Sequence, residues 1–144
     1  MNSLFFASYL GWIDYKTKLL PNKYVMSLII SSIALISVSP NSDLDQLLFS
    51  IFVSVLMFLA YLFVYFLSKK SFGLGDVKYS FALSLAPTYV FGANTTIYLH
   101  LVAFMMGGIA SIFLVIFKKV SKNHAIAFGP FMSLSYFLFL VLSL

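Results

Sequence analysis

The 144-residue sequence contains no cysteine and only two histidines. Without cysteine there is no disulfide, no thiolate zinc site and no cysteine nucleophile, and two isolated histidines are too few for a metal cluster. Carboxylates are scarce as well. The acidic residues are Asp14, Asp43, Asp45 and Asp76. Any chemistry that requires a carboxylate must therefore use one of these four side chains, and we expect neither a metal ion nor a cofactor.

Charged residues make up only 9% of the chain, whereas 62% of its residues are hydrophobic and the mean hydropathy is +1.02. Soluble domains contain about 45–50% apolar residues, so this composition indicates an integral membrane protein whose surroundings are the lipid bilayer. The nine lysines give a net charge of +5, which in a soluble chain would suggest nucleic-acid binding. Membrane topology explains them better, so no nucleic-acid partner is expected.

Hydropathy divides the chain into six candidate spans, because a bilayer core requires about 20 apolar residues per helix. The spans are Leu4–Ile13, Tyr24–Val38, Leu47–Leu67, Tyr79–Val90, Thr96–Phe117 and Ala125–Leu144. The first and fourth are short, so we expect the first to continue through Lys16 and the fourth to begin at Gly75 or Asp76. The first run lacks a basic n-region and a small-residue cleavage site, which indicates a retained span rather than a signal peptide.

Alternating the loops across the bilayer places every lysine on one side. These lysines are Lys16, Lys18, Lys23, Lys69, Lys70, Lys78, Lys118, Lys119 and Lys122. By the positive-inside tendency that side is cytoplasmic, which puts both termini outside and Asp43 and Asp45 in an outer loop. The sequence therefore predicts an all-α, polytopic bundle of about six transmembrane helices, N-out/C-out, forming a single domain over residues 1–144.

In this topology Asp14 and Asp76 lie at a similar depth, at the cytoplasmic ends of the first and fourth spans. An intramembrane charge costs at least about 2.5–3.5 kcal/mol, so such a residue indicates function by default. Two adjacent carboxylates cannot both ionise cheaply, and the pair supplies a base and an acid together. This is what peptide hydrolysis requires, and the two groups would titrate as one unit.

The stretch FGLGDVKY surrounds Asp76 with glycines. Gly73 and Gly75 permit unusual backbone angles and the close approach of another chain segment. An equally open alternative is a plain turn in which Asp76 is the N-cap of a helix.

Three stretches resemble the type IV prepilin peptidases, a group of GxGD intramembrane aspartyl proteases. In DYKTKLLPN, Asp14 is followed at the family's spacing by Pro21 and Asn22; GLGDVK matches the second catalytic motif in full; and IAFGPFMSL resembles the family's PFGPF segment, with Ala127 in place of the first proline. The motifs occur in family order and span almost the whole chain.

The resemblance implies that Asp14 and Asp76 form a catalytic dyad that cuts a prepilin-like precursor at the cytoplasmic face of the cell membrane, between a basic leader and an apolar segment. Larger bacterial relatives also methylate the new N-terminus through an added region with paired cysteines. Methylation is not expected here, and the short form looks more like the peptidases of tight-adherence pili or archaeal filaments.

The other motif residues have structural interpretations. Lys78 is more typical of a snorkelling anchor than of a substrate-positioning group, and Pro21 and Asn22 suit the turn after the first span. Only the resemblance places Gly129 and Pro130 at the mouth of the active site.

Further residues are expected to serve packing. Gly107, Gly108 and Gly129 are expected to permit close helix contact, and His100 to be a satisfied or interfacial histidine rather than a proton relay. The aromatic residues are expected to face lipid or to fill the bundle.

Two functions from different classes follow from the same aspartates. The first is an intramembrane aspartic endopeptidase. The alternative is a small proton- or ion-coupled transporter, which intramembrane carboxylates also serve. Against the transporter, both aspartates lie near one membrane surface, and the sequence shows no half-to-half repeat. The precursor's identity and the oligomeric state are left open.

Overall fold

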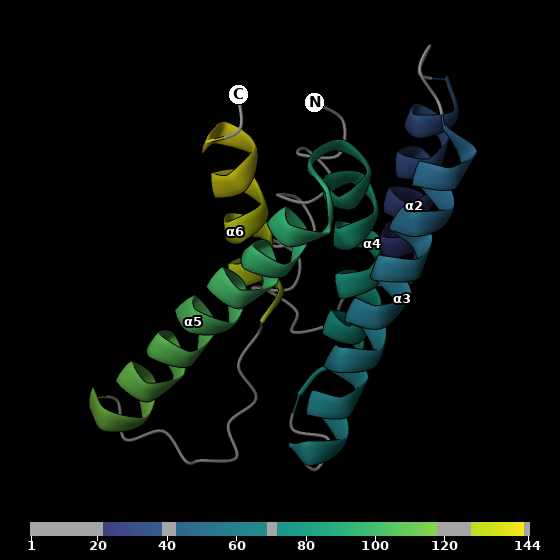
Figure 1. The fold of residues 1–144 in the computed structure, drawn as a ribbon. Helices are drawn as coiled ribbons and strands as arrows, with labels where there is room; N and C mark the ends of the chain where they lie inside the picture. Colours follow the sequence, from purple (N-terminus) through teal and green to yellow (C-terminus); the bar gives the residue numbers. More distant parts are fainter. Residues whose placement is uncertain (1–21, 39–42, 69–71, 118–127, 143–144) are drawn as a thin grey trace.

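In this computed structural model the described residues are 22–38, 43–68, 72–117 and 128–142 (Figure 1). Within these ranges the regular elements are all helices: α2 (Asn22–Val38), α3 (Leu44–Leu67), α4 (Leu74–Phe91), α5 (Ala93–Phe117) and α6 (Gly129–Leu142). The all-α class is confirmed, and these five helices overlap the second to sixth candidate spans, with α4 beginning at Leu74 rather than at Gly75 or Asp76. The first candidate span lies outside the described residues.

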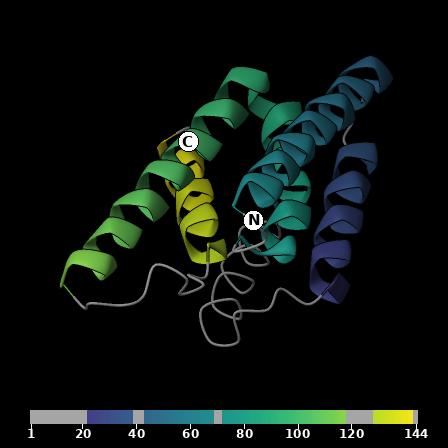
Figure 2. The same ribbon diagram turned by 90° about the horizontal axis from the view of Figure 1, so that it is seen from below.

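Helix α4 is the central element of the bundle. It packs against α2 and α3 on one side and against α5 and α6 on the other, and α5 also packs against α6, as Figures 1 and 2 show. Small buried side chains, including Ser80, Ala82 and Ser84, let the neighbouring helices approach α4 closely. The short connection from α4 to α5 turns at Gly92, whose φ of 86° favours glycine.

The distribution of side chains differs from that in a water-soluble protein, although an apolar core is present as well. Serine and threonine side chains such as Ser54, Ser84 and Thr96 are buried, whereas large apolar side chains such as Leu48, Phe52 and Phe63 are exposed over α3. Apolar patches of this extent are expected to meet lipid, and small polar side chains are typical of contacts between membrane helices. The surface thus agrees with the membrane character of the sequence.

Among the described helices, two are long and apolar enough to cross a bilayer: Leu44–Leu67 and residues Ala93–Phe113 of α5. Helix α2 is apolar but shorter, and α4 carries Asp76 and Lys78 in its first two turns. Six spans, the N-out/C-out orientation and a single domain over the whole chain therefore stay predictions.

Candidate active site

Asp76 lies in the first turn of α4, the helix at the centre of the bundle. The helix begins at Leu74 with Gly73 as its N-cap, and the Asp76 N–H donates to the Gly73 carbonyl at 3.1 Å. The aspartate is 5% exposed. A helix N-terminus attracts negative charge, so the buried acidic side chain lies at the end of α4 whose dipole is complementary to it.

The glycine before the helix has a role that differs from the sequence-based expectation. Gly73 has φ −74° and ψ 131°, an extended conformation open to any residue, so the unusual angles expected at this glycine are not found. The N-cap interpretation of Asp76 is also wrong, since Asp76 is the third residue of the helix. A Cβ added to Gly73 would lie 2.8 Å from Asp76 Oδ2. A side chain at position 73 would therefore require the Asp76 carboxylate, which lies against Gly73, to shift.

The first and second motifs meet at the side of α4 that faces α2. The Lys78 ammonium group donates to the Asn22 Oδ1 atom at 2.9 Å, and both side chains are exposed. This contact joins the last residue of DYKTKLLPN to the last residue of GLGDVK. Asp14 and Pro21 lie outside the described residues, so the pairing of Asp14 with Asp76 stays a prediction.

The second and third motifs meet through aromatic rings. Phe72 immediately precedes Gly73, and Phe128 immediately precedes Gly129 and Pro130. The two rings have centroids 5.2 Å apart in a T-shaped contact. Gly129 is the first residue of α6, and its carbonyl accepts the Ser133 hydroxyl at 3.0 Å. The segment expected at the mouth of the site therefore lies beside the segment that leads into Asp76.

Two further aromatic residues complete an aromatic cluster of Tyr61, Phe72, Phe104 and Phe128. The Tyr61 ring has its centroid 5.8 Å from that of Phe72 and 6.2 Å from that of Phe128. The Phe104 and Phe128 centroids are 5.1 Å apart. The cluster joins α3, α5 and the residues that precede α4 and α6.

The two adjacent glycines of α5 differ in what surrounds them. At Gly107 an added Cβ would lie 2.5 Å from the Phe128 ring, so this glycine makes room for the aromatic cluster. At Gly108 an added Cβ would meet no atom of the described residues within 4 Å. The expected close contact is therefore found at Gly107, whereas at Gly108 it stays a prediction.

A buried polar network adjoins the aromatic cluster. The Tyr61 hydroxyl lies 3.0 Å from His100 Nδ1, and the Ser84 hydroxyl lies 2.8 Å from His100 Nε2. A neutral imidazole has one donor and one acceptor nitrogen, and a hydroxyl can take either role. Both ring nitrogens of His100 thus have partners, which confirms the expected satisfied histidine.

Polar residues recur every four positions along α4. Asp76, Ser80, Ser84 and Thr88 are all buried, and this spacing places them on one face of the helix. They extend over about 18 Å, more than half of the roughly 30 Å hydrocarbon thickness. Sequence reasoning missed this polar face and the position of Tyr61. A search for polar residues at intervals of four around Asp76 would have found the face.

Comparison with known proteins identifies the family of the chain. The model of the type IV leader peptidase family matches residues 2–143. The chain belongs to this family. No curated protein and no solved structure matches it. The family confirms the resemblance drawn from the three motifs, indicates a peptidase of the membrane and implies a prepilin-like precursor as its substrate.

In this leader peptidase, two of the four aspartates lie far from Asp76. Asp43 is the N-cap of α3 and accepts the Asp45 N–H at 3.0 Å, while its own N–H donates to the Tyr89 hydroxyl at 3.2 Å. Tyr89 follows Asp76 by thirteen residues on α4, which corresponds to about 20 Å along the helix. Asp43 and Asp45 are therefore at the opposite end of α4 and cannot act together with Asp76.

Proposed function

We propose that this leader peptidase is an aspartic endopeptidase that removes the basic leader of prepilin-like precursors at the cytoplasmic face of the cell membrane, with Asp14 and Asp76 as its acid and base. The observation that carries the proposal is the burial of Asp76 in the first turn of α4, against Gly73. A buried carboxylate in a membrane helix is costly, and such a residue indicates function by default.

Elimination supports Asp14 as the partner. The sequence contains four carboxylate side chains, and Asp43 and Asp45 lie at the other end of α4. Within one chain, the remaining carboxylate is Asp14, which stands at the family's spacing before Pro21 and Asn22. If the acid and the base both come from this chain, they are therefore Asp14 and Asp76.

The proposed reaction uses the two carboxyl groups in different protonation states. The ionised carboxylate removes a proton from water, and the oxygen of that water attacks the carbonyl carbon of the scissile peptide. The protonated carboxyl polarises the carbonyl oxygen and then delivers its proton to the leaving nitrogen as the C–N bond breaks. The coupled pair shares its proton, so neither residue has a fixed role before substrate binds.

The test is cleavage of a co-expressed prepilin-like precursor by single variants. Asp14→Asn and Asp76→Asn should each reduce the cleavage rate by at least about 100-fold, the lower range of a general acid or base contribution. Asp43→Asn and Asp45→Asn are matched controls and should cleave at the wild-type rate. The amount of each variant in the membrane fraction is measured alongside. Wild-type processing by either Asp14→Asn or Asp76→Asn would refute the dyad.

A further inference from the structure

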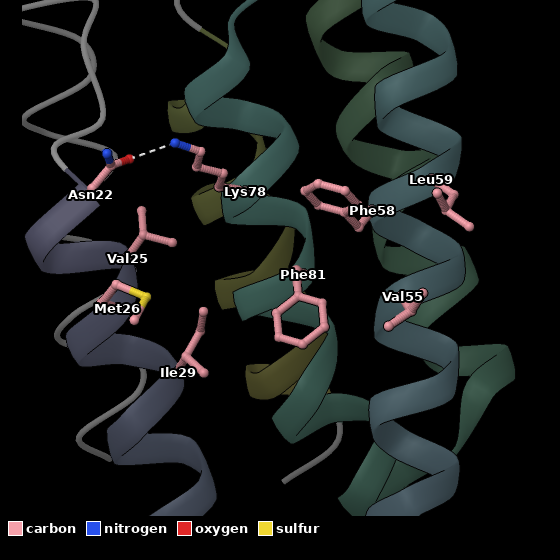
Figure 3. A pocket seen from close by; sticks show the side chains of 9 residues that line it. All are labelled: Asn22, Val25, Met26, Ile29, Val55, Phe58, Leu59, Lys78 and Phe81. Atoms are coloured by element: carbon pink, nitrogen blue, oxygen red, sulfur yellow. Dashed lines mark hydrogen bonds between the residues drawn. The ribbon is translucent and has the colours of Figure 1, made fainter.

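A groove lies between α2, α3 and α4, with a volume of about 680 Å³ (Figure 3). Apolar side chains from all three helices line it, including Ile29, Val55 and Phe81. On α4, Lys78 and Phe81 are about 200° and 140° around the helix from Asp76. The groove is therefore on a different side of α4 from the buried carboxylate.

One end of the groove is polar and positively charged. Lys78 and Asn22 lie together at this end, joined by their 2.9 Å hydrogen bond, while Ile29, Val55 and Phe81 lie farther along (Figure 3). An ammonium group has three donor hydrogens, of which Asn22 uses one. Because the Asn22 acceptor is a neutral amide, this bond does not compensate the charge of Lys78. The polar end thus offers both charge and donors to an anion.

The groove is short enough to lie within one leaflet of a bilayer. Lys78 is about 6 Å along α4 from its first residue, and the groove continues from there for about 10 Å, the rise from Asn22 to Ile29 on α2. One leaflet of hydrocarbon is about 15 Å thick. The order of a charged end followed by an apolar run of this length is that of a lipid in that leaflet.

We propose that this groove binds one anionic phospholipid, with its phosphate on Lys78 and an acyl chain against Ile29, Val55 and Phe81. The positive charge of Lys78 is complementary to the phosphate, and the apolar lining is complementary to the chain. The occupancy of the groove does not depend on the peptidase reaction, because Asp76 is absent from its lining.

The apolar helix of a precursor fits the groove less well than a lipid. Such a helix is about 10–12 Å wide and needs about 30 Å of length to cross the hydrocarbon. The groove is only about 10 Å long, a third of the length that the helix needs. A basic leader would also be repelled by Lys78. The precursor helix is the competing occupant, and the experiment below distinguishes it from a lipid.

The test is native mass spectrometry of the full-length protein in a neutral detergent, titrated with phosphatidylglycerol and separately with phosphatidylcholine. One phosphatidylglycerol per chain should be retained in preference to phosphatidylcholine. Lys78→Gln should lower its apparent affinity about fivefold, the usual effect of one lysine at an anionic lipid. Lys78→Arg should retain it, and the matched control Lys23→Gln, at an exposed lysine of α2, should leave it unchanged.

A steric pair of variants tests the apolar part of the groove. Val55→Trp should reduce lipid retention several-fold, because Val55 lines the groove. Leu56→Trp should not, because Leu56 is exposed to a similar degree but does not line the groove. Circular dichroism checks that both variants are folded. Equal retention of the two lipids, equal losses in Lys78→Gln and Lys23→Gln, or one-for-one displacement of the lipid by a precursor helix would each overturn the proposal.

Discussion

The contact between Gly73 and Asp76 predicts that Gly73→Ala separates activity from stability. Alanine suits the extended backbone of Gly73, but its Cβ would lie 2.8 Å from Asp76 Oδ2. The obstacle is the far end of a side chain, so the carboxylate can yield by about half an ångström at little cost to folding. Catalytic groups must be held within about 0.5 Å, and a 1 Å error costs about 100-fold. We expect the cleavage rate to fall about 10- to 100-fold.

The assay compares precursor cleavage in membranes with thermal unfolding of the purified protein. Gly108→Ala is the control, because within the described part of the chain an added Cβ there meets nothing within 4 Å; it should retain both activity and stability. Gly73→Ala should melt within a few degrees of wild type. Gly73 is exposed, and a substitution at an exposed position typically changes the free energy of unfolding by about 0.5 kcal/mol or less. A wild-type cleavage rate in Gly73→Ala would refute the argument that the space at Gly73 positions the carboxylate.

The aromatic cluster and the polar network give two further predictions, both measured by thermal unfolding in detergent. Gly107→Ala should destabilise the bundle by about 1–3 kcal/mol, because its Cβ would overlap the buried Phe128 ring; a stability equal to that of Gly108→Ala would contradict this. His100→Phe should cost about 1–3 kcal/mol by depriving the Tyr61 hydroxyl of its bond. The double variant with Tyr61→Phe should recover part of that loss, and strict additivity of the two changes would count against a direct coupling.

The helices could be read from the sequence because each is a long apolar run between polar interruptions. The beginning of α4 was harder, because Gly-Leu-Gly-Asp fits both an N-cap at Asp76 and a cap three residues earlier. The choice depends on where the Asp76 side chain lies relative to Gly73, a contact that local propensity does not encode. The first candidate span and Asp14 stay predictions, since they lie outside the described residues.

The aromatic and polar contacts around Tyr61 could not be predicted from hydrophobic periodicity. Tyr61 and His100 are 39 residues apart, and no local pattern pairs them. In a soluble helix the apolar stripe marks the buried face, but α3 has large apolar side chains such as Phe52 and Phe63 on its exposed surface. Hydrophobicity therefore gives little information on which residues of a membrane helix face inward.

Polar side chains carry that information instead, and α4 shows how. A small polar group is costly in lipid unless it finds a partner, so Ser80, Ser84 and Thr88 turn toward the neighbouring helices, where Ser84 meets His100 and Thr88 meets Thr96. The same requirement orients the whole helix. With its polar face turned into the bundle, Asp76 at the beginning of that face is buried, and Lys78, on a different side, is left at the groove between α2, α3 and α4.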